Sequence, residues 1–357
     1  MSNEINLDRR RFLGAAAMTF AAAQVGIVGS AAAQFAVEAA SPSLAGATGW
    51  LNSQPLNMAG LRGKVVLVDF WTYTCINWRR TLPYVRAWAE KYKEHGLVVV
   101  GVHTPEFGFE KNIENVRRAA NKDMSIDYPI AIDDDYAVWR AFENAYWPAI
   151  YLVDAKGQIL YHKFGEGDYE QSERAIQQLL TKAGEVGFDR NLVSVDATGA
   201  EVAADLANLK SGENYVGYGR TQNFASPGGA VADKRHTYAL PSRVKLNHWA
   251  LGGDWTTGKQ ATVLNAANGR IVYQFHARDL HLVMGPSAQV RPIRFRSSID
   301  EEAPGAAHGA DVDDQGNGAV TEPRLYQLIR QSNPITDRKF EIEFLDPGVE
   351  AFSFTFG

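Results

Sequence analysis

The sequence predicts an α/β domain followed by an all-β sandwich of the jelly-roll type, in one chain of 357 residues. Three observations support this fold class. The length exceeds the usual size of a single domain. Buried strands alternate with amphipathic helices over residues 48–186, the pattern of an α/β layer fold. Residues 187–357 are instead rich in Gly, Thr, Asn and short alternating strands, as in β sandwiches.

Residues 1–33 have the features of an export signal. The pair Arg9-Arg10 precedes an Ala/Gly-rich stretch, the pattern of a twin-arginine signal. Small residues at 31–33 predict cleavage before Gln34. Retention as a membrane anchor is the alternative, although the stretch is short for a bilayer span. We therefore expect a periplasmic mature chain with no integral membrane span, beginning with a polar tether over 34–47.

Composition narrows the classes of partner. Apolar residues make up 45% of the chain and charged residues 22%, which are ordinary globular values. The net charge is −5, and the sequence has no basic stripe of the kind that binds nucleic acid. The histidines form no metal-ligand pair at helical spacing. We expect no nucleic-acid partner and no cofactor.

The elements of the α/β domain follow from hydrophobic spacing. Continuous β-branched apolar runs predict buried strands, and apolar residues at helical spacing predict helices. Gly96 is expected to end the first helix, because glycine readily adopts the left-handed conformation at a helix end. The expected strands are 64–71, 97–102, 128–132, 149–153 and 158–163, the last two forming a hairpin, and the expected helices are 76–95, 109–122, 137–142 and 169–184.

In the second domain, period-two alternation predicts strands over 270–275, 339–344 and 351–356. The stretches 217–232 and 303–321 are expected to be loops, because both are rich in residues that favour turns.

The chain contains one cysteine, Cys75, so no intramolecular disulfide is available. In an oxidising compartment, an unpaired cysteine is either buried and inert or exposed and reactive. The position of Cys75 directly before an expected helix favours reactivity, since the free N–H groups and the helix dipole stabilise a thiolate. Such a position lowers a cysteine pKa below about 8.5.

Three features stand at consistent spacing around Cys75. Asp69 lies six residues before it at the end of an expected strand, Pro83 lies eight residues after it in the expected helix, and Trp147-Pro148 directly precedes a later strand. Over residues 45–185 this set resembles the thioredoxin superfamily, and the extra strand and helix after residue 97 resemble its TlpA/DipZ branch.

That resemblance implies an α/β thioredoxin-like domain over 48–186, with Cys75 as the nucleophile. It also implies thiol- or disulfide-bearing protein clients whose backbone lies in a groove formed by Trp147 and a cis Pro148. Arg79, in the first turn of the expected helix, is a candidate stabiliser of the thiolate. Trp147 has a second interpretation as a packing aromatic.

The sequence departs from the family at one position. The family motif Cys-x-x-Cys reads Cys75-Ile76-Asn77-Trp78 here, and Trp78 cannot resolve a mixed disulfide. We therefore expect a monothiol route in which an external thiol completes the exchange. Asp69, which the family uses to help deprotonate the second thiol, is a supporting residue of the site, a relic of that role or a plain strand-end carboxylate.

Two other functions stay open. Thr72 stands three residues before Cys75 as in peroxiredoxins, but those enzymes carry a proline where this chain has Val68, which weakens a peroxidase interpretation. The other is a non-catalytic scaffold with an inert cysteine, whose β domain binds a glycan or a protein partner.

The segments 277–283 and 323–329 resemble the β domain that follows the thioredoxin unit in DipZ-type proteins. That domain is described as similar to carbohydrate-binding modules, and the resemblance implies a β sandwich over 187–357. Trp249, Trp255, Tyr218 and Tyr273 are candidates for a flat sugar-binding face, with burial in the sandwich core as the alternative.

One expected loop has almost the spacing of a calcium site. Asp311, Asp313 and Glu322 nearly match a twelve-residue calcium loop, although Gln315 replaces a preferred ligand and no flanking helices are expected. A hairpin turn explains the same residues. The three carboxylates are therefore a weak metal candidate.

Overall fold

The computed structural model describes residues 43–287 and 291–357, so the expected signal at 1–33 and most of the expected tether at 34–47 lie outside the described residues. The chain divides into two compact units. The first holds the described residues up to Trp71, with 88–104 and 127–193, and the second holds 72–87, 105–126 and 194–357. The segment around Cys75 therefore belongs to the same unit as the C-terminal strands.

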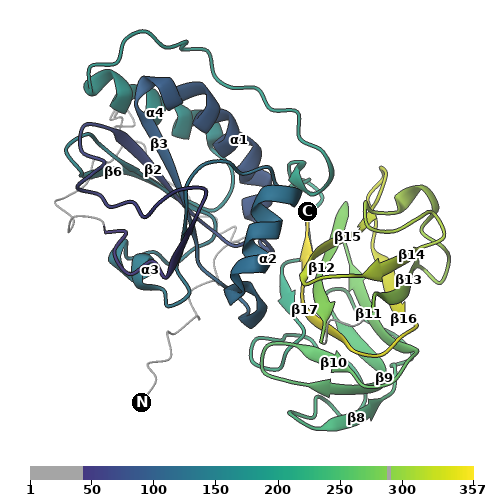
Figure 1. The fold of residues 1–357 in the computed structure, drawn as a ribbon. Helices are drawn as coiled ribbons and strands as arrows, with labels where there is room; N and C mark the ends of the chain where they lie inside the picture. Colours follow the sequence, from purple (N-terminus) through teal and green to yellow (C-terminus); the bar gives the residue numbers. More distant parts are fainter. Residues whose placement is uncertain (1–42, 288–290) are drawn as a thin grey trace, which may run out of the picture. The chain divides into compact units, whose positions relative to one another are not determined.

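The first unit is built on a six-stranded sheet in the order β1-β4-β3-β2-β5-β6 (Figure 1). The strands are β1 (Gly49–Leu51), β2 (Val65–Trp71), β3 (Leu97–His103), β4 (Ile130–Ile132), β5 (Ala149–Val153) and β6 (Ile159–Phe164). β2, β3 and β4 run parallel, and β5 and β6 form the predicted antiparallel hairpin. All residues of β2 are buried, as expected for a strand covered on both faces.

Helices α1 (Ile76–Tyr92) and α4 (Tyr169–Lys182) lie on one face of this sheet, and α3 (Ala137–Ala141) lies on the other (Figure 1). The end of α1 is tied to α4, because the Tyr92 hydroxyl donates to Glu173 at 2.6 Å. A 3-10 turn, η2 (Lys93–His95), follows α1 and ends at Gly96, whose φ of 85° is left-handed. The predicted α/β fold is confirmed.

The predicted helix at 109–122 is interrupted. It is a 3-10 turn η3 (Gly108–Lys111), a short helix α2 (Ile113–Arg118) and a π turn η4 (Ala119–Asp123). Asn112 separates the first two, because its extended backbone stops η3 and its side chain accepts from the N–H of Glu114 to begin α2.

Within the described residues, the second unit holds an eleven-stranded antiparallel sheet in the order β14-β13-β16-β11-β9-β10-β17-β12-β15, with β7 on β17 and β8 on β9. Its strands are β7 (Asn214–Tyr215), β8 (Arg235–Tyr238), β9 (Trp249–Thr257), β10 (Thr262–Leu264), β11 (Gly269–Phe275), β12 (Asp279–Pro286), β13 (Ile293–Ile299), β14 (Asn317–Val320), β15 (Arg324–Arg330), β16 (Arg338–Phe344) and β17 (Val349–Phe356).

The two halves of this sheet enclose a common apolar core. Phe354 of β17 contacts Tyr273 of β11 at 5.0 Å and Phe340 of β16 at 6.1 Å between ring centroids. This packing of one half against the other is that of the predicted β sandwich.

The loop predicted at 303–321 is partly wrong, since its last residues form β14 and pair with β13. Gly318 suggested a loop, but here it makes room for the ring of Phe295, which an added Cβ would approach to 2.3 Å.

Candidate functional site

Cys75 occupies the position directly before α1. Its carbonyl accepts the N–H of Arg79 at 3.0 Å, which is the first bond of the helix, and its own N–H donates to the carbonyl of Thr72 at 3.1 Å. The cysteine forms no intramolecular disulfide, since the sequence contains one cysteine, and its side chain is partly exposed. The sulfur therefore stands beside the N–H groups at the start of a helix, where a thiolate is favoured.

Trp78 and Arg79 lie on the first turn of the same helix. Trp78 is fully buried and fills core volume where the family has its second cysteine. Arg79 is half-buried; burial lowers the pKa of its guanidinium, and the nearby carboxylate of Glu201 opposes that shift. Both side chains thus share the unit that holds Cys75.

Glu110 is a buried acid that the sequence analysis did not single out. Its carboxylate accepts the hydroxyl of Thr74 at 2.5 Å, and the backbone N–H groups of Glu106 at 2.5 Å and Phe107 at 2.8 Å. Burial raises the pKa of Glu110 to about 7, against the opposing effect of its hydrogen bonds. Glu110 therefore fixes the side chain of Thr74, the residue before Cys75, by a hydrogen bond. The expected helix over 109–122 placed it on a polar face, and no sequence signal marked it as buried.

The remaining predicted residues lie in the first unit. Asp69 is fully buried in β2, opposite Ile150 of β5. Pro148 directly precedes β5 and follows Trp147 through a cis peptide bond. The indole N–H of Trp147 donates to the carbonyl of Thr104 at 3.1 Å, and its ring packs on Trp139 with centroids 4.2 Å apart. Asp69 and Pro148 are thus carried by paired strands, and Trp147 is packed as an aromatic.

The candidate sugar-binding face is not formed. Trp249, Trp255 and Tyr273 are buried in the sandwich core, and an enclosed ring cannot stack on a sugar. Tyr218 is partly exposed and donates its hydroxyl to Asp233 at 2.8 Å. The alternative, burial in the core, holds for the first three.

The three carboxylates of the candidate calcium loop have protein partners. Asp311 accepts from Arg324 at 2.6 Å, and Glu322 pairs with the same arginine at 3.4 Å. Asp313 accepts the N–H of Asn317 at 2.7 Å, which closes a turn. Across residues 43–287 and 291–357, no group of three His, Cys, Asp or Glu residues is placed to hold a metal ion.

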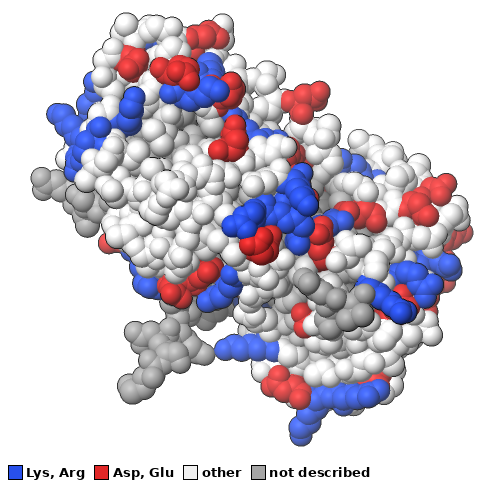
Figure 2. Space-filling model, viewed as in Figure 1, with Lys and Arg blue, Asp and Glu red and all other residues white. Residues whose placement is uncertain are grey.

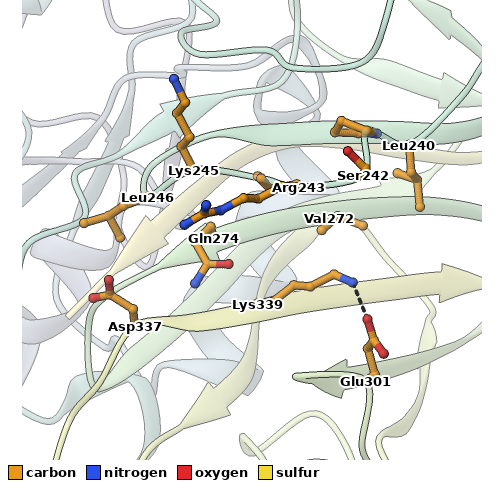
Figure 3. A pocket seen from close by; sticks show the side chains of 12 residues that line it. Leu240, Ser242, Arg243, Lys245, Leu246, Val272, Gln274, Glu301, Asp337 and Lys339 are labelled. Carbon is orange, nitrogen blue, oxygen red and sulfur yellow. Dashed lines mark hydrogen bonds and ion pairs between the residues drawn. The ribbon is translucent and has the colours of Figure 1, made fainter.

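A groove of about 510 Å³ lies on the second unit, away from Cys75 in sequence. In Figure 3 the Arg243 side chain extends over Gln274, and Lys339 reaches Glu301, with which it forms an ion pair of 2.9 Å. Leu240 and Leu246 add apolar surface. The lining combines charges of both signs with apolar side chains.

The face drawn in Figure 2 carries lysines and arginines interspersed with aspartates and glutamates. Neither sign forms a continuous area there. This distribution agrees with the absence of a basic stripe in the sequence.

No helix among the described residues is both long enough and apolar enough to cross a bilayer.

Comparisons with known proteins match both parts of the chain. The Redoxin family model matches residues 36–180, and the model described as Thioredoxin like C-terminal domain matches residues 211–357. Protein DipZ of Mycobacterium bovis is 38% identical over 277 residues, which are 76% of this chain and 39% of DipZ. The chain thus spans about two fifths of the length of that relative.

Thiol-disulfide oxidoreductase YkuV of Bacillus subtilis is 30% identical over 141 residues, covering 40% of this chain and 94% of YkuV. A solved thioredoxin-like protein in its oxidised form is 31% identical, with a TM-score of 0.37, and covers 40% of this chain and 95% of that chain. On the family models and on the DipZ and YkuV relationships, this chain belongs to the TlpA/DipZ-like group of the thioredoxin superfamily.

Proposed function

We propose that this protein takes part in thiol–disulfide exchange through Cys75 alone, with thiol- or disulfide-bearing proteins as clients. The observation that carries the proposal is the placement of the single cysteine, partly exposed, at the start of α1. Membership of a thiol–disulfide family supports the same chemistry. The buried Trp78, which stands in place of a second thiol, supports a monothiol route for this chemistry.

The proposed exchange has two steps. The Cys75 thiolate attacks one sulfur of a client disulfide, so that a mixed disulfide forms and the second client sulfur leaves as a thiolate. An external thiolate then attacks the client sulfur of the mixed disulfide and releases Cys75. One disulfide bond breaks and one forms in each step, and the client leaves with the external thiol bound in a disulfide. Asp69 and the Trp147-Pro148 segment are proposed to serve the fold and the client groove, respectively.

The test is the alkylation rate of Cys75 in the folded protein as a function of pH. We expect the pH dependence of the rate to give a thiol pKa below about 8.5, the pKa of a free cysteine, because the start of the helix stabilises the thiolate. Cys75→Ser is expected to abolish both alkylation and exchange. A thiol that reacts only after unfolding would overturn the proposal and leave the scaffold interpretation.

We also propose that the protein is exported to the periplasm by the twin-arginine route. The Arg9-Arg10 pair and the small residues that follow support this location. The double variant Arg9→Lys, Arg10→Lys is expected to keep the protein out of the periplasmic fraction, with wild type as the control. Unchanged export would contradict the twin-arginine route.

The groove of the second unit supports a second candidate function, in which the protein binds a partner without redox chemistry. Its open, mixed lining of Arg243, Gln274 and Asp337 suits a polar segment of another protein. Cys75→Ser separates the two candidates. This variant abolishes thiol–disulfide exchange, but it leaves partner binding unchanged if the partner binds in the groove.

A further inference from the structure

Ile76, the residue after Cys75, is packed inside the second unit. Ile76 lies in an apolar cluster with Phe107 and with four side chains from the β strands, namely Tyr215, Val283, Leu325 and Phe352. Phe107 and Phe109 approach Phe352 with centroids 5.1 and 4.7 Å apart. We call Tyr215, Leu325 and Phe352 the cover, because they pack on Ile76, the residue next to Cys75.

Polar links surround the cover. Glu106, which is nearly buried, accepts from the Tyr215 hydroxyl at 2.7 Å and from Arg220 at 2.9 Å. The Arg220 guanidinium lies 3.5 Å from the centroid of the Tyr215 ring. A charged pair that is shielded from water contributes more than an exposed one, so these links hold the cover in place.

Two further arginines fix the same segments to the β strands and their connections. Arg86 of α1 forms a two-pronged pair with Glu201, at 3.0 and 2.6 Å. Arg118 of α2 pairs with Glu322 at 2.9 Å. The segments 72–87 and 105–126 are therefore held at several points along their length.

Cys75 therefore has little solvent-exposed surface beside it along the chain. Tyr73, Thr74, Ile76 and Trp78 are exposed by 1%, 2%, 4% and 0%, whereas Cys75, Asn77 and Arg79 are partly exposed. A specific complex with a folded protein uses about 800 Å² on each partner. The four buried side chains beside Cys75 cannot contribute to such an area while the cover is in place.

We propose that the cover selects the partners of Cys75 by size, admitting small thiols, small disulfides and unfolded segments, and excluding folded proteins. This inference rests on the proposed function and deepens it, since it names the class of substrate. Extended or small partners need only a narrow path to the sulfur. A folded client reaches it only when the cover opens locally.

The experiment compares two reagents with the same chemistry. The full chain reacts with N-ethylmaleimide and with a maleimide attached to a folded carrier protein, and each rate is divided by that of an unstructured peptide with the sequence of residues 72–79. For wild type we expect the carrier-bound reagent to be slowed at least about tenfold more than the free reagent, because it needs the cover to open.

Two variants loosen the cover in different ways. Phe352→Ala removes packing, and Arg220→Gln removes an ion pair. Both are expected to raise the carrier-bound rate about tenfold and the free rate less than about twofold. Phe295→Ala, which removes a buried ring outside the cover, and Arg235→Gln, which removes an exposed pair with Asp254, are the matched controls and should leave the ratio unchanged.

The outcomes separate the two proposals. Equal normalised rates in wild type, or a ratio unaffected by both cover variants, overturn the size selection and leave the exchange proposal standing. If N-ethylmaleimide does not react with wild type but reacts with the cover variants, the cover blocks Cys75 completely. That result supports the cover and overturns thiol–disulfide exchange by the native protein. A free reagent that fails in every folded variant overturns both.

Discussion

Glu110 is one residue through which pH is expected to act on stability. Its pKa is raised by burial to about 7 from a usual value of 4.5. The folded state therefore holds a proton that the unfolded chain releases in this range. The stabilising contribution is complete below about pH 4.5 and is lost as the pH rises through about 7.

Glu110→Gln should remove this dependence. Relative to the variant, wild type is expected to lose up to about 3 kcal/mol of unfolding free energy between pH 4.5 and pH 8. Urea unfolding across that range measures the difference. Glu114→Gln, at an exposed position on α2, is the control and should follow wild type. Parallel curves for wild type and Glu110→Gln would contradict the raised pKa.

Trp78 offers a test of how much of a two-thiol site is preserved. Trp78→Cys removes a fully buried ring and is expected to cost about 3–5 kcal/mol of stability. In the folded fraction, the new thiol is expected to resolve mixed disulfides on Cys75, so that the variant reduces a small disulfide under recycling by an external dithiol.

The matched control for that variant is Trp88→Cys, which removes another fully buried ring of α1 outside the motif. It should lose similar stability without gaining two-thiol activity. Equal reduction rates for the two variants would mean that the surroundings of Cys75 no longer support the two-thiol reaction.

The residues of the site differ in how far the sequence could predict them. Cys75, Trp78 and Arg79 follow from one short motif and its helix. The burial of Glu110 depends on how residues 105–111 fold back over the Thr72–Cys75 turn, and local spacing does not encode that. The burial of Trp249, Trp255 and Tyr273 likewise depends on the register of strands far apart in the chain.

At the scale of elements, the turn before β14 depends on one glycine. Gly316 has a φ of 79°, and an added Cβ would lie 2.0 Å from the carbonyl oxygen of Ser297. Its N–H donates to the carbonyl of Asp313 at 2.9 Å. Any side chain at this position would meet both an unfavourable backbone conformation and a backbone atom.

Gly316→Ala is therefore expected to cost about 2–4 kcal/mol, measured by chemical or thermal unfolding. Gly229→Ala is the control, because Gly229 has a similar φ of 75° but no atom within 4 Å of an added Cβ. It should cost only about 1 kcal/mol. Equal losses would show that the backbone conformation alone, and not the close approach to Ser297, sets the cost.

The elements of the two units were predictable to different degrees. Long apolar runs such as 65–71 specify a buried strand by themselves, and the hairpin of β5 and β6 carries its own turn signal. The short strands of the second unit contain Gly, Asn and Thr, and they are held by pairing with distant strands. β14 is the example, since Asn317 and Gly318 predict a loop until β13 is beside them.

At the scale of the whole molecule, α1 joins the two units. Its first residues up to Ala87 belong to the second unit, and the rest belong to the first. A helix interrupted in the middle loses the hydrogen bonds that continue across the break. We therefore expect that when either unit unfolds, α1 and the other unit unfold with it in a single transition.

Scanning calorimetry of the full chain tests this coupling. Wild type should give one endotherm whose calorimetric and van't Hoff enthalpies agree. Arg86→Ala removes the two-pronged pair with Glu201 and should broaden or split that endotherm, because α1 then loses a polar anchor in the second unit. Arg117→Ala, which removes an exposed pair with Glu114 on α2, should leave it unchanged. Two resolved endotherms in wild type would mean that α1 frays at the unit boundary and that the units are stable independently.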